Sequence, residues 1–190
     1  ERVLRRDGTE ILRRSQIKLP GLHNVENYMA AIAAVEGVVS DETIRTLAAE
    51  FGGVEHRIEL VREKDGVRYY NDSIASSPTR TIAGLRSFDE KLILIAGGYD
   101  KHIPYDVLGP EIVEHVKTLV LTGATAEKIR QAVLAAPGYR PGCPEILEEA
   151  DFYDAIHTAA RCAGPGDVVM LSPASASFDH FRNFMERGEE

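Results

Sequence analysis

The sequence predicts an α/β protein whose mostly parallel sheet carries helices on both faces, preceded by a shorter segment of different organisation. Two observations lead to this prediction. From about residue 77 onward, apolar runs of strand length alternate with runs of helical periodicity. The strand runs "KLILIAG", "KTLVLTG" and "DVVMLS" are almost continuously apolar, as strands buried on both faces are.

The first part of the chain predicts two helices after a hairpin. Its expected elements, in order, are a hairpin over residues 2–18 that turns at Asp7-Gly8, a helix from Asn24 to Gly37, and a helix that Ser40 caps and residues 51–53 close. A domain boundary is expected near residues 52–56. Because the chain opens without an initiator methionine, we expect a piece of a longer protein.

The second part begins at a strong hairpin signal, Asp65-Gly66, between two alternating runs. The elements expected after this hairpin are a helix over 77–88, a strand over 91–97, a helix near 110, a strand over 117–123, helices over 125–135 and 150–162, a strand over 167–172, and a helix over 177–187. Ligands of such sheets bind at the carboxyl ends of the strands. That rule selects four loops, over residues 71–79, 97–105, 122–125 and 172–177.

The composition excludes several classes of protein. Of the 190 residues, 44% are hydrophobic and 27% are charged, and no apolar run reaches the roughly 18 to 20 residues that a membrane helix needs. The net charge of -8 disfavours binding to a nucleic-acid backbone. Cys143 and Cys162 lack the spacing of a zinc site or a disulfide framework. We therefore expect a soluble, cytoplasmic protein that binds neither membrane nor nucleic acid.

The loop over residues 71–79 is rich in small hydroxyl residues. Ser76 or Ser77 before Pro78 is the pattern of a helix N-cap with proline in the first turn. The same helix start can also hold an anion with free backbone N–H groups and hydroxyls, beside the carboxylate of Asp72. The two interpretations are compatible, and both remain open.

Two further loops carry candidate ligands. Gly97-Gly98 permits a sharp turn that brings Lys101 to the sheet edge, where it can anchor a carboxylate, although a merely solvated lysine is the alternative. His102 has no partner at metal-ligand spacing, so we predict no metal site there. Residues 122–125 are interpreted as a turn and a cap, because the dinucleotide pattern GxGxxG is absent.

Aromatic residues near the end and asparagines near the start also stand out. Phe178, Phe181 and Phe184 recur at helical spacing, which favours core packing of the predicted helix over 177–187. No GxSxG elbow is present, so a nucleophilic serine is not expected. Asn24 and Asn27 share one face of the first helix and indicate either capping or amides presented to a polar ligand such as a base.

Five stretches together resemble the Mur ligase family, the ATP-dependent amide-bond ligases of peptidoglycan precursor synthesis. These stretches are "GLHNVENYMAAIAA", "EHRIE", "YNDSIASSPTRT", "GGYDK" and "LSPASASFDHFRNFMERG". Each is weak alone, but all five occur in the family order over nearly the whole chain. The last is close to specific for the member that adds D-glutamate.

The resemblance implies a domain organisation. Residues 1–54 would be the tail of the central ATP-binding domain, without its GxxxxGK[ST] phosphate loop. Residues 55–190 would be a C-terminal Rossmann-like domain that binds the incoming amino acid. The chain alone would be an inactive part of a monomeric ligase, since half of the cleft is missing.

The resemblance also implies a reaction and its residues. ATP with Mg²⁺ would phosphorylate the carboxylate of UDP-N-acetylmuramoyl-L-alanine, and the amine of D-glutamate would attack the acyl phosphate. Nucleotide contacts are implied at Asn24, Asn27, His56, Arg57 and Asp72, and D-glutamate contacts at Ser76, Lys101, Ser177, Phe178 and Phe184. Metal ligands are expected outside this chain, and no residue within it need be a covalent nucleophile.

The chain departs from the family pattern in places. Many members have Lys where this chain has Ile74, Thr at Ser76, and an aliphatic residue at Phe178. Ile74 removes a positive charge that would contact phosphate or carboxylate. Two other functions remain open, a non-catalytic nucleotide-binding module and a nicotinamide-dependent oxidoreductase.

Overall fold

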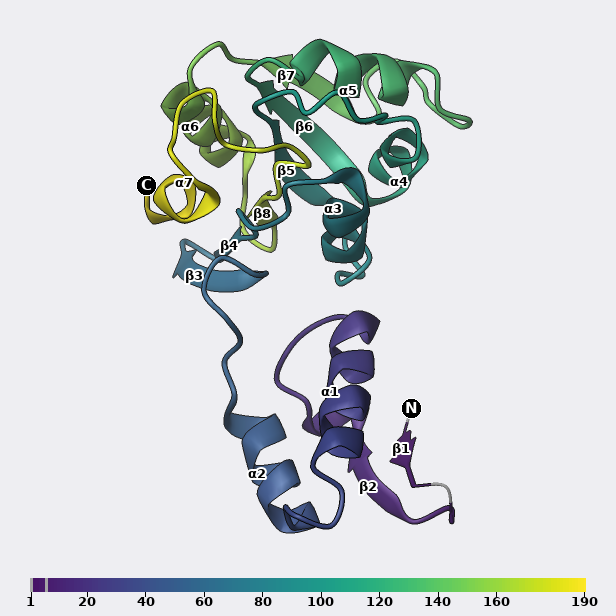
Figure 1. The fold of residues 1–190 in the computed structure, drawn as a ribbon. Coiled ribbons are helices and arrows are strands. Elements are labelled where there is room, and N and C mark those ends of the chain that lie inside the picture. The colour runs from purple at the N-terminus through teal and green to yellow at the C-terminus, as the bar shows by residue number, and fades with distance from the viewer. Residues whose placement is uncertain (1, 6) are drawn as a thin grey trace. The chain divides into compact units, whose positions relative to one another are not determined.

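The computed structural model describes residues 2–5 and 7–190. It contains two compact units, Glu1–Gly53 and Val54–Glu190 (Figure 1). No helix among the described residues is long and apolar enough to cross a membrane.

The first unit contains the predicted hairpin and two helices. Its elements are β1 (Arg2–Leu4), β2 (Glu10–Arg13), the 3-10 helix η1 (Arg14–Gln16), α1 (Leu22–Ala34) and α2 (Asp41–Glu50). Ser40 caps α2 as predicted, since its hydroxyl accepts a hydrogen bond from the Thr43 amide at 3.2 Å. Helix α1 ends at Ala34, before the expected Gly37, which lies in the following turn with a φ of 78°.

The second unit is the predicted α/β sheet. Its elements are β3 (Glu59–Lys64), β4 (Val67–Asn71), α3 (Pro78–Leu85), β5 (Leu92–Gly97), α4 (Leu108–His115), β6 (Val116–Thr122), α5 (Ala126–Leu134), β7 (Glu145–Glu148), α6 (Phe152–Cys162), β8 (Val168–Leu171) and α7 (Phe184–Glu189). The strand order is β3-β4-β8-β5-β6-β7. Only β3 runs antiparallel to its neighbour, through the hairpin predicted at Asp65-Gly66.

The order of the strands explains the position of the helices. From β4 the chain moves outward through β5, β6 and β7, and then returns so that β8 lies between β4 and β5. Crossovers between parallel strands are right-handed. Helices α3, α4 and α5, which connect strands in the outward direction, therefore cover one face, and α6, which connects β7 back to β8, covers the other. Figure 1 shows α3, α4 and α5 on one side of the sheet and α6 on the other.

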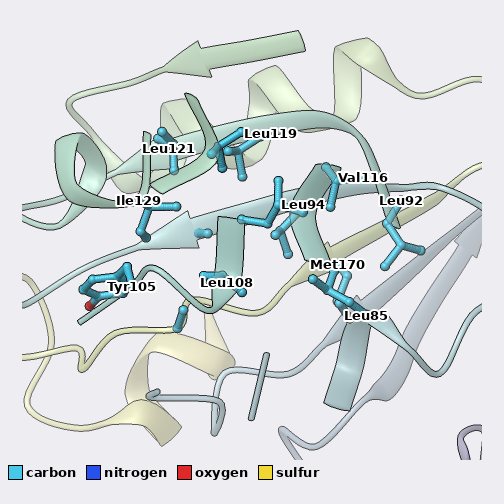
Figure 2. Close-up of a cluster of buried hydrophobic side chains, with 14 of the residues drawn as sticks. Leu85, Leu92, Leu94, Tyr105, Leu108, Val116, Leu119, Leu121, Ile129 and Met170 are labelled. Atoms are coloured by element: carbon cyan, nitrogen blue, oxygen red, sulfur yellow. The ribbon is translucent and has the colours of Figure 1, made fainter. Parts of the chain in front are cut away.

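Alternate residues of each central strand feed two separate cores. Leu92 and Leu94 of β5 belong to the larger cluster, which packs against α3, α4 and α5 (Figure 2). Ile93 and Ile95 belong to a second cluster that packs against α6. Because successive side chains of a strand point to opposite faces, a continuously apolar strand must be covered on both, as the sequence predicted.

One element prediction was wrong in part, and one strand was missed. Residues 177–183 form turns, and only Phe184–Glu189 is helical, because Asn183 has an extended φ of -159° and its side chain accepts a hydrogen bond from the Glu186 amide. Asparagine favours such a cap over a helix interior. Strand β7 was not predicted, since "EILE" has only two apolar residues and too short an alternation.

Candidate functional site

Four loops meet where β4, β8, β5 and β6 end. The Gly97 amide donates to Pro173 O at 2.8 Å, the Tyr99 amide to Ala176 O at 2.9 Å, and the Thr125 amide to Gly98 O at 3.1 Å. Three of the four loops selected from the sequence, those over residues 97–105, 122–125 and 172–177, are therefore joined by their backbones. This edge includes the point where the strand order reverses, which is where open α/β sheets bind ligands.

Gly97 allows this close approach. Its φ is 118°, and a Cβ atom built there would lie 1.8 Å from the backbone oxygen of Thr122. Any side chain would force β5 and β6 apart at their carboxyl ends. The Gly-Gly pair identified from the sequence is thus required by packing between strands as well as by the turn.

Arg187 of α7 fastens the loops after β4 and β8 to each other. Its side chain is buried, with 3% exposure. Nε and Nη2 donate to the hydroxyl and carbonyl oxygens of Ser73 at 3.0 and 2.8 Å, and Nη1 donates to the carbonyl oxygens of Ser175 and Ala176, both at 3.1 Å. One guanidinium therefore sets the distance between the two loops.

Burial has an electrostatic consequence for Arg187. It lowers the pKa of the guanidinium to about 10, against the opposing influence of Asp179. The side chain therefore remains charged near neutral pH. The Oδ2 atom of Asp179 is buried without a hydrogen-bond partner among the described residues, so it supplies negative charge near Arg187 without a direct bond.

A buried cluster of hydroxyl groups joins the loops after β5, β6 and β8. Ser175 Oγ lies 2.8 Å from both Tyr105 Oη and Thr125 Oγ1. The three residues come from the ends of β8, β5 and β6. Because each hydroxyl can donate and accept, the cluster satisfies its own buried polar atoms and fixes the loops at a second level.

His56 lies beneath α7. Its Nδ1 accepts a hydrogen bond from Asn71 Nδ2 at 3.0 Å, and that amide also donates to Gly188 O at 2.8 Å. A Cβ atom on Gly188 would lie 2.4 Å from His56 Nδ1. The imidazole packs edge-on against Phe184, with ring centroids 6.1 Å apart. His56 and Phe184, both predicted from the sequence, thus share one cluster.

The segment that contains His56 is strained. His56 and Ile58 have φ values of 63° and 45°, and a β-branched residue in the left-handed region is an outlier. Strain of this kind persists where the surroundings overdetermine the backbone, often at functional sites. Here Asp72 holds the segment, because its Oδ1 accepts from the Ile58 amide at 3.3 Å. Arg57, between the two strained residues, has an exposed side chain.

Asp72 points inward, not toward solvent. The residue is 3% exposed, and its Oδ2 accepts a hydrogen bond from Ser172 Oγ at 2.7 Å. Burial raises the pKa of the Asp72 carboxyl from 3.8 to about 7, although the bonds from Ser172 and Ile58 and the charges of Arg57 and Arg80 oppose the shift. The carboxylate therefore organises backbone and hydroxyl groups.

The raised pKa of Asp72 predicts how stability depends on pH. The folded chain holds the proton of Asp72 more tightly than the unfolded chain does. The resulting contribution to the free energy of unfolding is complete below pH 3.8 and is lost as pH rises through about 7. Asp72→Asn should flatten the decline in unfolding free energy over this window, by up to about 1.4 kcal/mol per pH unit. Urea unfolding followed by circular dichroism at several pH values measures it.

The control for Asp72→Asn is Asp89→Asn, which removes an exposed carboxylate at a turn. This variant should retain the pH dependence of the parent chain. If the unfolding free energy of Asp72→Asn declines with pH as steeply as that of the parent, Asp72 does not titrate in this window.

The remaining predicted residues of this unit occupy the rim of the same edge. Lys101 is exposed, and it follows Tyr99, whose ring packs edge-on against Phe178 at 5.8 Å. Phe178 is 62% exposed, so it is a surface residue and not part of the expected core. Ser177 is buried, and its backbone oxygen accepts from the Phe181 amide at 2.8 Å.

Of the two serines proposed as the N-cap of α3, the structure selects Ser77. Ser77 is the N-cap residue and Pro78 is in the first turn, as the ordinary interpretation required. The Ser77 hydroxyl lies 3.3 Å from Thr79 Oγ1 and makes no capping bond to the backbone. Ser76, half-buried just before the helix, donates its amide to Ile74 O at 2.8 Å.

Asn24 and Asn27 belong to the first unit. Asn24 is buried, and its Nδ2 donates to Pro20 O at 2.7 Å, while its Oδ1 accepts from Asn27 Nδ2 at 3.3 Å. Asn27 is exposed. The first amide is thus fixed by the preceding loop and orients the second at the surface of α1.

Sequence reasoning missed the residues that join the loops, above all Arg187, Ser175 and Asn71. Arg187 lies inside the quoted C-terminal stretch, but arginine is mostly exposed in proteins, and nothing local marks this one as buried. Within residues 2–5 and 7–190, no group of three or more His, Cys, Asp or Glu side chains is arranged to hold a metal ion.

The fold and the convergent loops define an α/β domain of Rossmann-like topology. Residues 56–175 match the family model described as Mur ligase, glutamate ligase domain. The chain belongs to the Mur ligase family.

Curated relatives extend the comparison beyond that domain. UDP-N-acetylmuramoylalanine--D-glutamate ligase from Acetivibrio thermocellus is 60% identical over 189 residues, which cover 96% of this chain and 40% of the relative. The ligase of the same name from Clostridium kluyveri is 52% identical over 182 residues, with the same coverage of both chains. The present chain therefore spans about two fifths of the length of these relatives.

Solved structures support the fold. UDP-N-acetylmuramate-alanine ligase from Thermotoga maritima superposes with a TM-score of 0.66 at 17% identity, covering 91% of this chain and 39% of that one. At this identity the likeness concerns the fold alone.

Proposed function

We propose that this chain is the C-terminal part of an ATP-dependent ligase that joins D-glutamate to UDP-N-acetylmuramoyl-L-alanine. The observation that carries the proposal is the 60% identity, over 96% of this chain, to a ligase of that name. The geometry supports it, because four of the residues that the family resemblance assigns to D-glutamate lie on loops at the carboxyl edge of the sheet, namely Ser76, Lys101, Ser177 and Phe178. The fifth, Phe184, begins α7, which Arg187 joins to the loops after β4 and β8.

The two units receive different roles in this proposal. Residues 1–54 are the tail of the ATP-binding domain, and residues 55–190 bind the incoming amino acid. The γ-phosphoryl group of ATP is transferred to the carboxylate of UDP-N-acetylmuramoyl-L-alanine, which leaves ADP. The amine of D-glutamate then attacks the acyl phosphate, loses a proton and expels phosphate. The protein contributes positioning and charge stabilisation.

The residues proposed for the nucleotide fit that role unequally. Asn27 is exposed and its Oδ1 makes no hydrogen bond to any residue that the structure describes, so it can accept from the adenine amino group. Arg57 is exposed and cationic. Asn24 and Asp72 are buried and engaged by protein groups. We propose that Asn24, Asp72 and His56 orient Asn27 and Arg57. The ligands of Mg²⁺ are expected to come from the rest of the ligase.

The charge missing at Ile74 has a replacement nearby. Arg80 of α3 donates from Nη1 to the backbone oxygen of Ile74 at 3.1 Å, and its side chain is exposed. A guanidinium therefore lies against the residue where many members of the family carry Lys. We propose that Arg80, near Ser76, supplies the positive charge at the start of α3.

The recognition of D-glutamate is divided among Ser76, Lys101, Ser177, Phe178 and Phe184. Lys101 offers a free ammonium to a carboxylate. Phe178 presents an exposed ring beside Tyr99, and Phe184 closes the cluster around His56. The complete enzyme is proposed to act as a monomer in the cytoplasm, without nucleic-acid or membrane partners.

The function is tested by comparing the 190-residue chain with the complete ligase. The complete ligase should release phosphate from ATP when UDP-N-acetylmuramoyl-L-alanine and D-glutamate are both present, and L-glutamate should not replace D-glutamate. The isolated chain should release none above background. Ligase activity of the isolated chain, or nicotinamide binding detected by fluorescence, would contradict the proposal.

A further inference from the structure

Lys101 lies beside a carboxylate that does not pair with it. It is exposed and forms no hydrogen bond or ion pair with any residue among 2–5 and 7–190. Its neighbour Asp100 would be an immediate counter-ion for the Lys101 ammonium. Instead, Asp100 Oδ2 accepts a hydrogen bond from Lys128 Nζ at 2.5 Å. Asp100 therefore pairs with Lys128, which is distant in the sequence, and not with the adjacent Lys101.

Asp100 is held by both of its oxygens. Oδ1 accepts from the His102 amide at 2.8 Å, a local turn in which His102 has a φ of 57°. Oδ2 is shared by Lys128 and, at 3.4 Å, by His102 Nδ1. The bond from Lys128 is the main reason that the pKa of the Asp100 carboxyl is lowered. Both oxygens of the carboxylate are thus engaged, and its charge is paired with Lys128 instead of Lys101.

Lys128 reaches Asp100 from a helix that is fastened to the same loop. Thr125 is the N-cap residue of helix α5, and its amide donates to Gly98 O at 3.1 Å. On the other side, the Tyr99 amide donates to Ala176 O at 2.9 Å. These two bonds fix the loop just before Lys101 to both neighbouring loops, while the lysine itself has no partner among the residues that the structure describes.

We propose that Lys128 is a positioning residue that keeps Lys101 available for the carboxylate of the amino-acid substrate by occupying Asp100. The inference rests on the proposed function, in which Lys101 binds D-glutamate. Without Lys128, Asp100 can turn toward the adjacent ammonium, and the substrate carboxylate must then compete with a carboxylate tethered to the same loop. An attached competitor has a high effective concentration.

The test uses four variants of the complete ligase and the KM for D-glutamate. Lys128→Met should raise KM about two- to fivefold, the factor that an exposed ion pair is typically worth, with kcat unchanged. Lys128→Arg should restore KM. Asp100→Asn should leave KM near that of the parent, because the amide keeps the turn with His102 and does not compete. The double variant Lys128→Met/Asp100→Asn should also return to the parent KM.

The double variant separates competition from simple support of the loop. If the ion pair only stiffened the loop, Asp100→Asn would raise KM as much as Lys128→Met, and the double variant would remain impaired. Either result overturns the proposal. A matched control is Lys117→Met, which breaks a similar pair with Asp167, at 2.6 Å, at the other end of the sheet and should not change KM.

A further variant separates this inference from the proposed function. If Lys101→Ala raises KM but Lys128→Met and Lys128→Gln do not, the role of Lys128 is wrong and the proposed site stands. If Lys101→Ala has no effect, both fail. Lys128 has a side chain that is 48% exposed, and circular dichroism of each variant verifies that it folds.

Discussion

Replacing Arg187 by Met in this chain should lower the free energy of unfolding by about 3 to 5 kcal/mol. The guanidinium donates to two oxygens of Ser73 and to the carbonyl oxygens of Ser175 and Ala176. Methionine fills part of the volume but leaves buried acceptors without donors, each of which costs about 1 to 3 kcal/mol. These costs overlap, because the two loops can relax together. Urea unfolding followed by circular dichroism measures the loss.

The matched control is Arg182→Met, five positions earlier in the chain. Its side chain is 90% exposed and forms an ion pair with Glu186 at 3.5 Å, so the loss of unfolding free energy should be below about 1 kcal/mol. Arg187→Lys should recover only part of the loss, because one ammonium cannot span both loops. Equal stabilities of Arg187→Met and Arg182→Met would show that Arg187 does not hold the loops together.

Replacing Lys101 by Ala in the complete ligase should raise the KM for D-glutamate about 10- to 100-fold. A hydrogen bond to a charged group is worth about 1.5 to 3 kcal/mol, and no partner of the Lys101 ammonium among the described residues would reduce this value. The KM for ATP should change little. Steady-state kinetics with D-glutamate as the varied substrate give both constants.

Two variants serve as controls for Lys101→Ala. Lys101→Arg keeps the positive charge, so its KM for D-glutamate should stay closer to that of the parent. Lys91→Ala removes an exposed lysine just before β5, where Nζ donates to Val113 O at 3.0 Å, and should leave the KM for D-glutamate unchanged. An unchanged KM in Lys101→Ala would remove Lys101 from the substrate site.

The sequence predicted the strands and the layers well because their signals are local. A buried strand such as β5 needs apolar residues on both faces, and "LILIAG" carries them within six residues. Capping at Ser40 and turning at Asp65-Gly66 likewise depend on neighbours in the chain. Where the local signal was short or ambiguous, as in β7 and residues 177–183, the prediction failed.

The C-terminal aromatic residues illustrate that failure. Phe178 and Phe184 have helical spacing, but spacing alone does not establish a continuous helix. Asn183 interrupts the segment by capping a new helix with its side chain. The consequence for the site is large, since Phe178 becomes an exposed ring beside Tyr99 while Phe184 packs against His56.

By itself, the sequence determined the fold class, the family and the edge of the sheet at which ligands are expected. These follow from periodicity and from short motifs, both of which are properties of neighbouring residues. Only the tertiary structure decided that Asp72 is buried, that Lys101 has no partner within residues 2–5 and 7–190, and that Arg187 joins two loops. Arg187 and Ser73 are 114 residues apart, and a contact of that kind forms only after the chain between them has folded, so no local pattern encodes it.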